Sequence, residues 1–356
     1  MIRWIPVLLC VLLLHLPLAL AQPATLLPGS PPQYVCPPCP HVGHILDGER
    51  HAAPGTCAVC GMALVELPVD AGRSPVLREG PGAFALAVGP DGARRVHAFY
   101  YRPSTLHARS PVLLVLPGAG RNAWTYRDHW IEAADAHGVL VVALHYPERE
   151  YPDFWSYNLA GMLADVQIDT AARTLADYTI VDDRQRWLFD DLDAVFAAVV
   201  RGSGLETTRY DLFGHSAGGQ LLHRFALFAD ADTRADRIVA ANSGWYTVPE
   251  RDARFPYGLA DAPITDAQLA TAFSRRLVVL LGEEDNAGER RGELVRNPQA
   301  DRQGTHRLAR GQYFHRQAAQ AARAMDTPLH WTLDIVPGVG HDAQAMAQAA
   351  AHLLYP

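Results

Sequence analysis

Short apolar runs alternate with longer stretches of helical periodicity along most of this chain. Runs of about five or six apolar residues are too short for buried helices and predict central parallel strands. These strands are expected at 111–116, 139–144, 237–241, 277–281 and 331–335. Helices are expected at 122–137, 184–200, 219–226 and 343–354. Strands that alternate with helices predict an α/β fold in which helices cover both faces of a mostly parallel sheet.

Two further segments have strand character and lie ahead of the first central strand. Residues 83–88 and 94–101 flank the turn-forming sequence Gly-Pro-Asp-Gly at 89–92 and predict a β-hairpin. The segment 289–310 is rich in arginine and acids and is expected to be a solvated loop or a lid. The aromatic residues between Tyr146 and Tyr157, with Trp245 and Tyr246, are expected either to line an apolar pocket or to pack in the core.

The first 21 residues differ from the rest of the chain. Residues 5–20 are almost wholly apolar, follow a single positive charge at Arg3, and end in the small residues that a signal peptidase recognises. We expect a signal peptide at 1–21 and export to the periplasm or the medium. A retained anchor is the alternative, but the run is short and interrupted by Pro6 and Pro17, so no stable membrane span is expected after cleavage.

Composition describes a globular chain. Hydrophobic residues make up 49% and charged residues 19% of the 356 residues, which is enough apolar material for a substantial core. The formal net charge of -7 offers no positive surface for a polyanion. Nucleic acid is therefore excluded as a partner.

A proline-rich linker at 22–33 leads into a short segment with two Cys-x-x-Cys pairs. Cys36 and Cys39 form the first pair, Cys57 and Cys60 the second, and residues 40–56 separate them. This spacing is typical of a tetrahedral metal site, and four thiolates suit Zn²⁺ or another soft ion. The segment 34–67 is therefore predicted to be a small Cys-rich, zinc-ribbon-like module.

Two disulfides are the alternative in an oxidising compartment. The second pair continues as Gly61-Met62 and then Leu64-Val65, and in this it resembles the heavy-metal-binding domain of bacterial efflux and copper-handling proteins. The first pair departs from that family, because Pro38 and Cys39 stand where Met and His are usual. The resemblance favours a bound ion, and four protein ligands imply a structural or sensing role. A linker at 68–82 follows, so deletion of residues 22–80 is expected to leave the activity of the rest of the chain largely intact.

The pentapeptide Gly-His-Ser-Ala-Gly at 214–218 follows the β-favouring segment 210–213 and precedes an apolar helical run. Strand, tight turn and helix are the context of a nucleophile elbow, with Ser216 as the nucleophile. The turn places the backbone N–H of Ala217 at a helix N-terminus, where a developing negative charge is favoured. An incidental serine in a Gly-rich loop is the alternative.

Partners for this serine follow two later strands. Asp285 comes after the strand at 277–281, and His341 lies in a Gly-rich loop after the strand at 331–335. The order Ser, Asp, His is that of an α/β-hydrolase triad. Glu283 and Glu284 compete for the role of the acid. The competing histidines are His306, His315, His330 and His352.

With these motifs, residues 83–356 resemble an α/β-hydrolase, similar to exported esterases and polyhydroxyalkanoate-depolymerase-like enzymes. The resemblance implies an acyl-enzyme mechanism, a small-molecule or polymeric ester as substrate, and no cofactor for catalysis. It also implies a backbone oxyanion hole, for which we name Ala119 with Ala217. The loop before Ala119 has Pro117-Gly118 where the family usually has His-Gly.

Two other functions fit the same residues. A peptidase or acyltransferase uses the same triad, because the motif activates a serine without specifying the acyl donor. The chain is alternatively a metal-binding protein in which the hydrolase fold is an inactive scaffold.

Overall fold

The computed structural model describes residues 26–39, 41–72 and 74–356. The expected signal peptide and the first residues of the proline-rich linker lie outside this range. Within the described residues, no helix is both long and apolar enough to cross a membrane.

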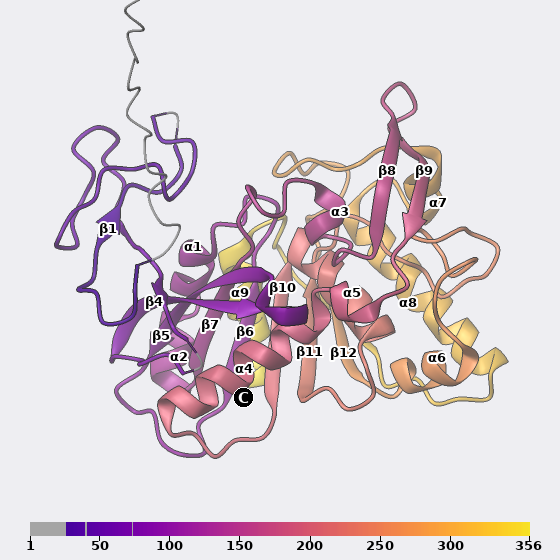
Figure 1. Ribbon diagram of the computed structural model, residues 1–356. Helices are drawn as coiled ribbons and strands as arrows, with labels where there is room; N and C mark the ends of the chain where they lie inside the picture. The colour runs from indigo at the N-terminus through magenta and orange to yellow at the C-terminus, as the bar shows by residue number, and fades with distance from the viewer. Residues whose placement is uncertain (1–25, 40, 73) are drawn as a thin grey trace, which may run out of the picture.

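A nine-stranded sheet forms the centre of the molecule (Figure 1). Its strands are β3 Val69–Asp70, β4 Gly80–Val88, β5 Arg94–Arg102, β6 Val112–Leu116, β7 Leu140–His145, β10 Tyr210–His215, β11 Ala235–Ala241, β12 Arg276–Gly282 and β13 Thr332–Val336. The spatial order is β13-β12-β11-β10-β6-β7-β5-β4-β3. Only β5 runs antiparallel to its neighbours β4 and β7, and the other pairs are parallel. The predicted central strands and the β4–β5 hairpin, which turns at η1 Pro90–Gly92, are confirmed.

Helices cover both faces of the sheet. The cluster of buried residues on one face includes residues of α4 Phe189–Ser203, α5 Ala217–Phe228, α6 Asp266–Phe273 and α8 Arg307–Ala324. The cluster on the other face includes residues of α1 Ala123–Asp128, α2 Ile131–His137 and α9 Ala343–Leu354. The central strands are buried on both sides, which explains why they are continuous apolar runs.

The prediction of a single helix at 122–137 is wrong, because the chain forms two helices with a break at His129 and Trp130. The Trp130 side chain is 1% exposed and packs edge-on against Phe213 of β10, with ring centroids 5.1 Å apart. Burial of this indole against the sheet stabilises the chain in its broken conformation. Helical periodicity alone does not reveal such a break.

Several elements were not predicted. Between β7 and α4, the helix α3 Phe154–Tyr157, an antiparallel hairpin of β8 Leu163–Asp169 and β9 Thr174–Ile180, and the 3₁₀ turn η2 Arg184–Arg186 follow one another. Figure 1 shows the hairpin projecting beyond the sheet near α7 Pro298–Gln303. Asn297, the N-cap of α7, donates a hydrogen bond of 2.9 Å to the carbonyl of Arg173 at the hairpin tip. Most of the hairpin is exposed, so it lacks the apolar signal of a central strand.

The Cys-rich module packs directly on the hydrolase sheet. Its short strands β1 Tyr34–Val35 and β2 Val65–Glu66 pair antiparallel, and β3, in the segment predicted as a linker, pairs parallel with β4. One hydrophobic cluster joins module residues to residues of the sheet such as Phe99 of β5. Its module members are Val35, Ile45, Val65 and Leu67, and Leu26 of the preceding linker joins them. The module therefore shares a core with the larger domain.

Candidate active site

Ser216 lies between β10 and α5 in a conformation that few non-glycine residues adopt, with φ 57° and ψ -111°. Two flanking glycines make the turn possible. A Cβ on Gly218 would lie 2.0 Å from the carbonyl oxygen of Leu116, and a Cβ on Gly214 would lie 2.5 Å from that of Gly218. Strand, strained serine and helix therefore pack at contact distance, as a nucleophile elbow requires.

The three residues predicted as a triad lie together. His341 Nε2 is 3.1 Å from Ser216 Oγ, and His341 Nδ1 is 2.7 Å from Asp285 Oδ2. Asp285 is 1% exposed and His341 8% exposed. Each follows a different strand, so the carboxyl edge of the parallel sheet brings residues 125 positions apart in sequence into one hydrogen-bonded chain.

The competing residues have other partners. Glu283 accepts a hydrogen bond from the backbone N–H of Gly338. The ring of His306 caps α8 by accepting from the N–H of Ala309. His315, His330 and His352 contact the backbone carbonyls of Trp331, Ser274 and Gln348, respectively. None of these contacts joins a competing histidine to Ser216.

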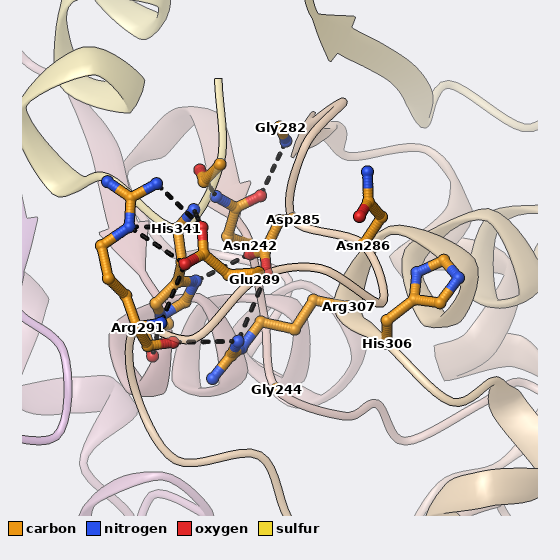
Figure 2. Close-up of polar contacts among 12 residues, drawn as sticks. Asn242, Gly244, Gly282, Asp285, Asn286, Glu289, Arg291, His306, Arg307 and His341 are labelled. Atoms are coloured by element: carbon orange, nitrogen blue, oxygen red, sulfur yellow. Dashed lines mark hydrogen bonds and ion pairs between the residues drawn. The ribbon is translucent and has the colours of Figure 1, made fainter. Parts of the chain in front are cut away.

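Two residues that were not predicted hold the acid and the histidine loop (Figure 2). The guanidinium of Arg307 donates to the second oxygen of Asp285 at 3.2 Å, and its side chain is 4% exposed. Asn242, at the end of β11, accepts from the N–H of Gly282 and donates to the carbonyl of Gly340. Asn242 thus links the loop that carries Asp285 to the loop that carries His341.

The loop expected to be solvated or a lid lies against the histidine. Glu289 accepts a hydrogen bond of 2.6 Å from the backbone N–H of His341, and Arg291 pairs with both Glu289 and Asp342. These contacts lower the pKa of Glu289 well below its usual range, with the Arg291 guanidinium as the main cause. A Cβ on Gly292 would lie 3.1 Å from His341 Nε2. The loop therefore borders the nucleophile from the solvent side.

The two predicted oxyanion donors lie on either side of the elbow. Ala217 is the first residue of α5, so its N–H has no partner within the helix. Ala119 is exposed in the loop after β6, next to Gly118, whose added Cβ would lie 3.5 Å from Ser216 Cβ. The Tyr157 hydroxyl donates to the carbonyl of Pro117 at 2.7 Å and holds this loop in place. No signal in the sequence connects Tyr157 with the loop.

His215, the residue before the nucleophile, was also not predicted to have a role. Its Nδ1 lies 3.0 Å from the Tyr126 hydroxyl, and its ring centroid lies 4.5 Å from that of His341. Burial lowers the pKa of His215 well below its ordinary value. A neutral ring beside His341 adds no second positive charge when His341 is protonated.

The aromatic residues after β7 divide between core and pocket. Tyr146, Tyr151 and Tyr157 are buried in the core. Phe154 and Trp245 instead line a pocket of about 360 Å³ between the β8–β9 hairpin and the loop ending at Val295. Its other lining residues are Ile168, Thr170, Arg173, Thr174, Leu175, Tyr257 and Glu293. The pocket is largely apolar, and its wall begins one residue beyond Gly292.

The Cys module brings three of its four predicted ligands together. The sulfurs of Cys36, Cys57 and Cys60 lie within 4.8 Å of one another, and the side chain of Cys39 interacts with those of Cys36 and Cys60. All four are free thiols, so the alternative of two disulfides is not what the structure contains. Hydrogen bonds from the backbone of Cys60 and Val59 lower the pKa of Cys57 to about 7, toward the thiolate form that binds metal. Thiolates on one tetrahedral zinc ion are about 3.8 Å apart, so this donor set fits such an ion.

The fold and this site define an α/β-hydrolase with a serine nucleophile elbow. No protein-family model and no curated protein matches the chain. Among solved structures, poly(aspartic acid) hydrolase-1 from Sphingomonas sp. KT-1 is 34% identical with a TM-score of 0.69, over 79% of this chain and 100% of that one. LpqC, a poly(3-hydroxybutyrate) depolymerase from Bordetella parapertussis, is 33% identical with a TM-score of 0.68, over 78% and 90% of the respective chains. The chain belongs to the α/β-hydrolase family of serine esterases and polymer depolymerases and is an enzyme of the ester-hydrolase kind.

Removal of the Arg307 guanidinium should impair both the site and the fold. We expect Arg307→Met to lower kcat about 10- to 100-fold, because Asp285 loses the contact that orients it. The free energy of unfolding should fall by about 3 kcal/mol, since a buried carboxylate loses its cation. Arg316→Met, at an exposed position of the same helix, is the matched control. Unchanged kcat in Arg307→Met would show that Asp285 needs no such support.

Proposed function

We propose that this protein is an exported serine hydrolase that cleaves carboxylic esters through Ser216, His341 and Asp285. The observation that supports this most strongly is the hydrogen-bonded chain from Ser216 Oγ through the His341 ring to buried Asp285. Export is proposed from the sequence of residues 1–21 alone. We also propose the predicted division of the chain into a Cys module at 34–67 and a hydrolase domain at 83–356.

In this mechanism, Ser216 Oγ attacks the acyl carbon while His341 Nε2 accepts its proton. Asp285 holds Nδ1–H of the ring and stabilises the imidazolium that forms. The backbone N–H groups of Ala217 and Ala119 bind the oxyanion, and loss of one such donor costs on the order of 10²–10³ in rate. His341 then gives the proton to the leaving alcohol, and water, activated by the same ring, frees the acyl group from Ser216.

Catalysis needs no cofactor in this proposal. A soft ion such as Zn²⁺ would be held by Cys36, Cys57 and Cys60, with Cys39 as the fourth ligand. When bound, it would cross-link the module as a structural ion.

The pocket between the β8–β9 hairpin and the loop ending at Val295 is the proposed substrate site. Its lining is mainly apolar, with Ile168 and Val295 exposed, Trp245 at its wall, and only Arg173 and Glu293 charged. Such a surface favours uncharged acyl groups, as in an aliphatic polyester or a small ester. An amide substrate is the second candidate, because the relative that is 34% identical is a poly(aspartic acid) hydrolase. A polyanion, however, would find only one cation in this pocket.

The test combines labelling with turnover. A fluorophosphonate should label the mature protein once, at the peptide that contains Ser216, and p-nitrophenyl acyl esters should be hydrolysed. A series of p-nitrophenyl esters of increasing acyl length shows which acyl length the pocket prefers. Parallel assays with poly(3-hydroxybutyrate) and poly(aspartic acid) distinguish ester cleavage from amide cleavage. Labelling without hydrolysis of any ester would show that the serine is reactive but that the substrate is an amide or that the reaction is acyl transfer. Absence of both would leave a metal-binding protein on an inactive scaffold.

A further inference from the structure

Three histidines from separate segments meet between the Cys module and the sheet. His97 of β5 and His145 of β7 are direct cross-strand partners, so their side chains leave the sheet on the same face. Their ring centroids are 5.6 Å apart. His44, from the module, lies beside His145, with the two ring centroids 6.5 Å apart.

Four of the six nitrogens of these rings are buried without a hydrogen-bond partner among the described residues. His97 is fully buried, and neither its Nδ1 nor its Nε2 makes a hydrogen bond. The Nε2 atoms of His145 and His44 are likewise buried and unpaired. An unpaired buried polar group costs about 1–3 kcal/mol, so four such nitrogens in one place require an explanation.

The surroundings of His145 fit a ligand role. Its Nδ1 lies 2.7 Å from the carbonyl oxygen of Arg121, which fixes the proton on Nδ1 and leaves the Nε2 lone pair free. A backbone carbonyl that orients a histidine in this way is the usual outer contact of a metal ligand. The rings of Phe99 and Trp124 enclose the same histidine and exclude water from one side.

We propose that His44, His97 and His145 form a second metal site, for a divalent ion of the zinc type, at the junction of the module and the hydrolase domain. Two imidazoles on one tetrahedral ion have ring centroids about 5 Å apart, given Zn–N distances of about 2.0–2.1 Å. The observed separations are 5.6 Å for His97 and His145 and 6.5 Å for His44 and His145, and the three rings do not yet place their nitrogens within 4.8 Å of one another, so binding draws the loop that carries His44 toward the sheet. Water would take the fourth position.

Binding changes one existing contact. The Nδ1 atom of His44 accepts a long hydrogen bond of 3.3 Å from the N–H of Leu46. Coordination through Nε2 moves the ring proton to Nδ1 and breaks this contact, so His44 is the ligand that closes last. The salt bridge between Asp47 and Arg149 holds the same module loop against the segment that follows β7.

The test counts ions and identifies their ligands in the mature full-length chain, prepared without a histidine tag. Zinc titration should give two ions per chain, and X-ray absorption should show one sulfur-rich and one imidazole-rich shell. His97→Gln and His145→Gln should each lose one ion or bind it at least ~100-fold more weakly. His41→Gln, at an exposed position of the same module, is the control and should retain both.

A second variant separates the two sites. With Cys36, Cys39, Cys57 and Cys60 replaced by Ser, one ion should remain, and Co²⁺ should bind without the charge-transfer absorption of a thiolate. If that variant does not fold, the number of zinc ions bound by His97→Gln and His145→Gln still tests the proposal. One ion per chain with an all-sulfur shell, unchanged in His97→Gln and His145→Gln, would overturn the proposal and leave water as the partner of these rings.

Discussion

We expect Ser216→Ala to lower kcat for ester hydrolysis by about 10⁶, because removal of a triad nucleophile leaves only binding and the oxyanion hole. Asp285→Asn should cost about 10⁴, since the amide favours the wrong tautomer of His341 while the geometry is retained. The rates are measured with p-nitrophenyl esters on the mature protein. Circular dichroism and the unfolding midpoint show whether each variant is folded.

The triad also predicts non-additivity. Ser216→Ala combined with His341→Ala should be no slower than Ser216→Ala alone, because the two residues act as one unit. Ser203→Ala, near the end of α4, and Asp334→Asn, exposed on β13, are the matched controls and should retain full activity. Loss of less than tenfold in Ser216→Ala would place the nucleophile elsewhere.

Deletion of residues 22–72 is expected to destabilise the hydrolase domain strongly, contrary to what the sequence alone suggested. The deletion removes β3 from the sheet edge and exposes the apolar cluster around Phe99. A single truncation within the cluster makes the test quantitative. Leu67→Ala should lower the free energy of unfolding by about 2–5 kcal/mol, because Leu67 is 1% exposed and leaves a cavity.

Urea unfolding of the purified chain measures both effects. Leu27→Ala is the matched control, since Leu27 is 70% exposed and its removal should change stability by less than about 0.5 kcal/mol. The measurements are made with zinc and with chelator, so that loss of packing is distinguished from loss of an ion. A truncated chain that keeps the urea midpoint of the full chain would show that the module is independent.

The candidate triad was accessible from sequence because each of its signals is local. Ser216 is marked by glycines within two residues, and Asp285 and His341 each follow an apolar run that could only be a strand. The residues that support the triad have no such local signal in the sequence. Arg307 lies in a segment read as a solvated loop, and Asn242 has its partners 40 and 98 positions away.

The same contrast applies to the possible metal ligands. The spacing of the two Cys-x-x-Cys pairs is visible in the sequence, although only the tertiary structure shows that the sulfurs of Cys36, Cys57 and Cys60 lie within 4.8 Å of one another. His97 and His145 become neighbours only through the register of β5 on β7, and His44 joins them only because the module docks on that face. Periodicity and motif determined the α/β order, the nucleophile elbow and the cysteine pairs of this protein. The shared core, the buried cation at Asp285 and the histidine cluster were decided by packing between distant segments, which no local pattern encodes.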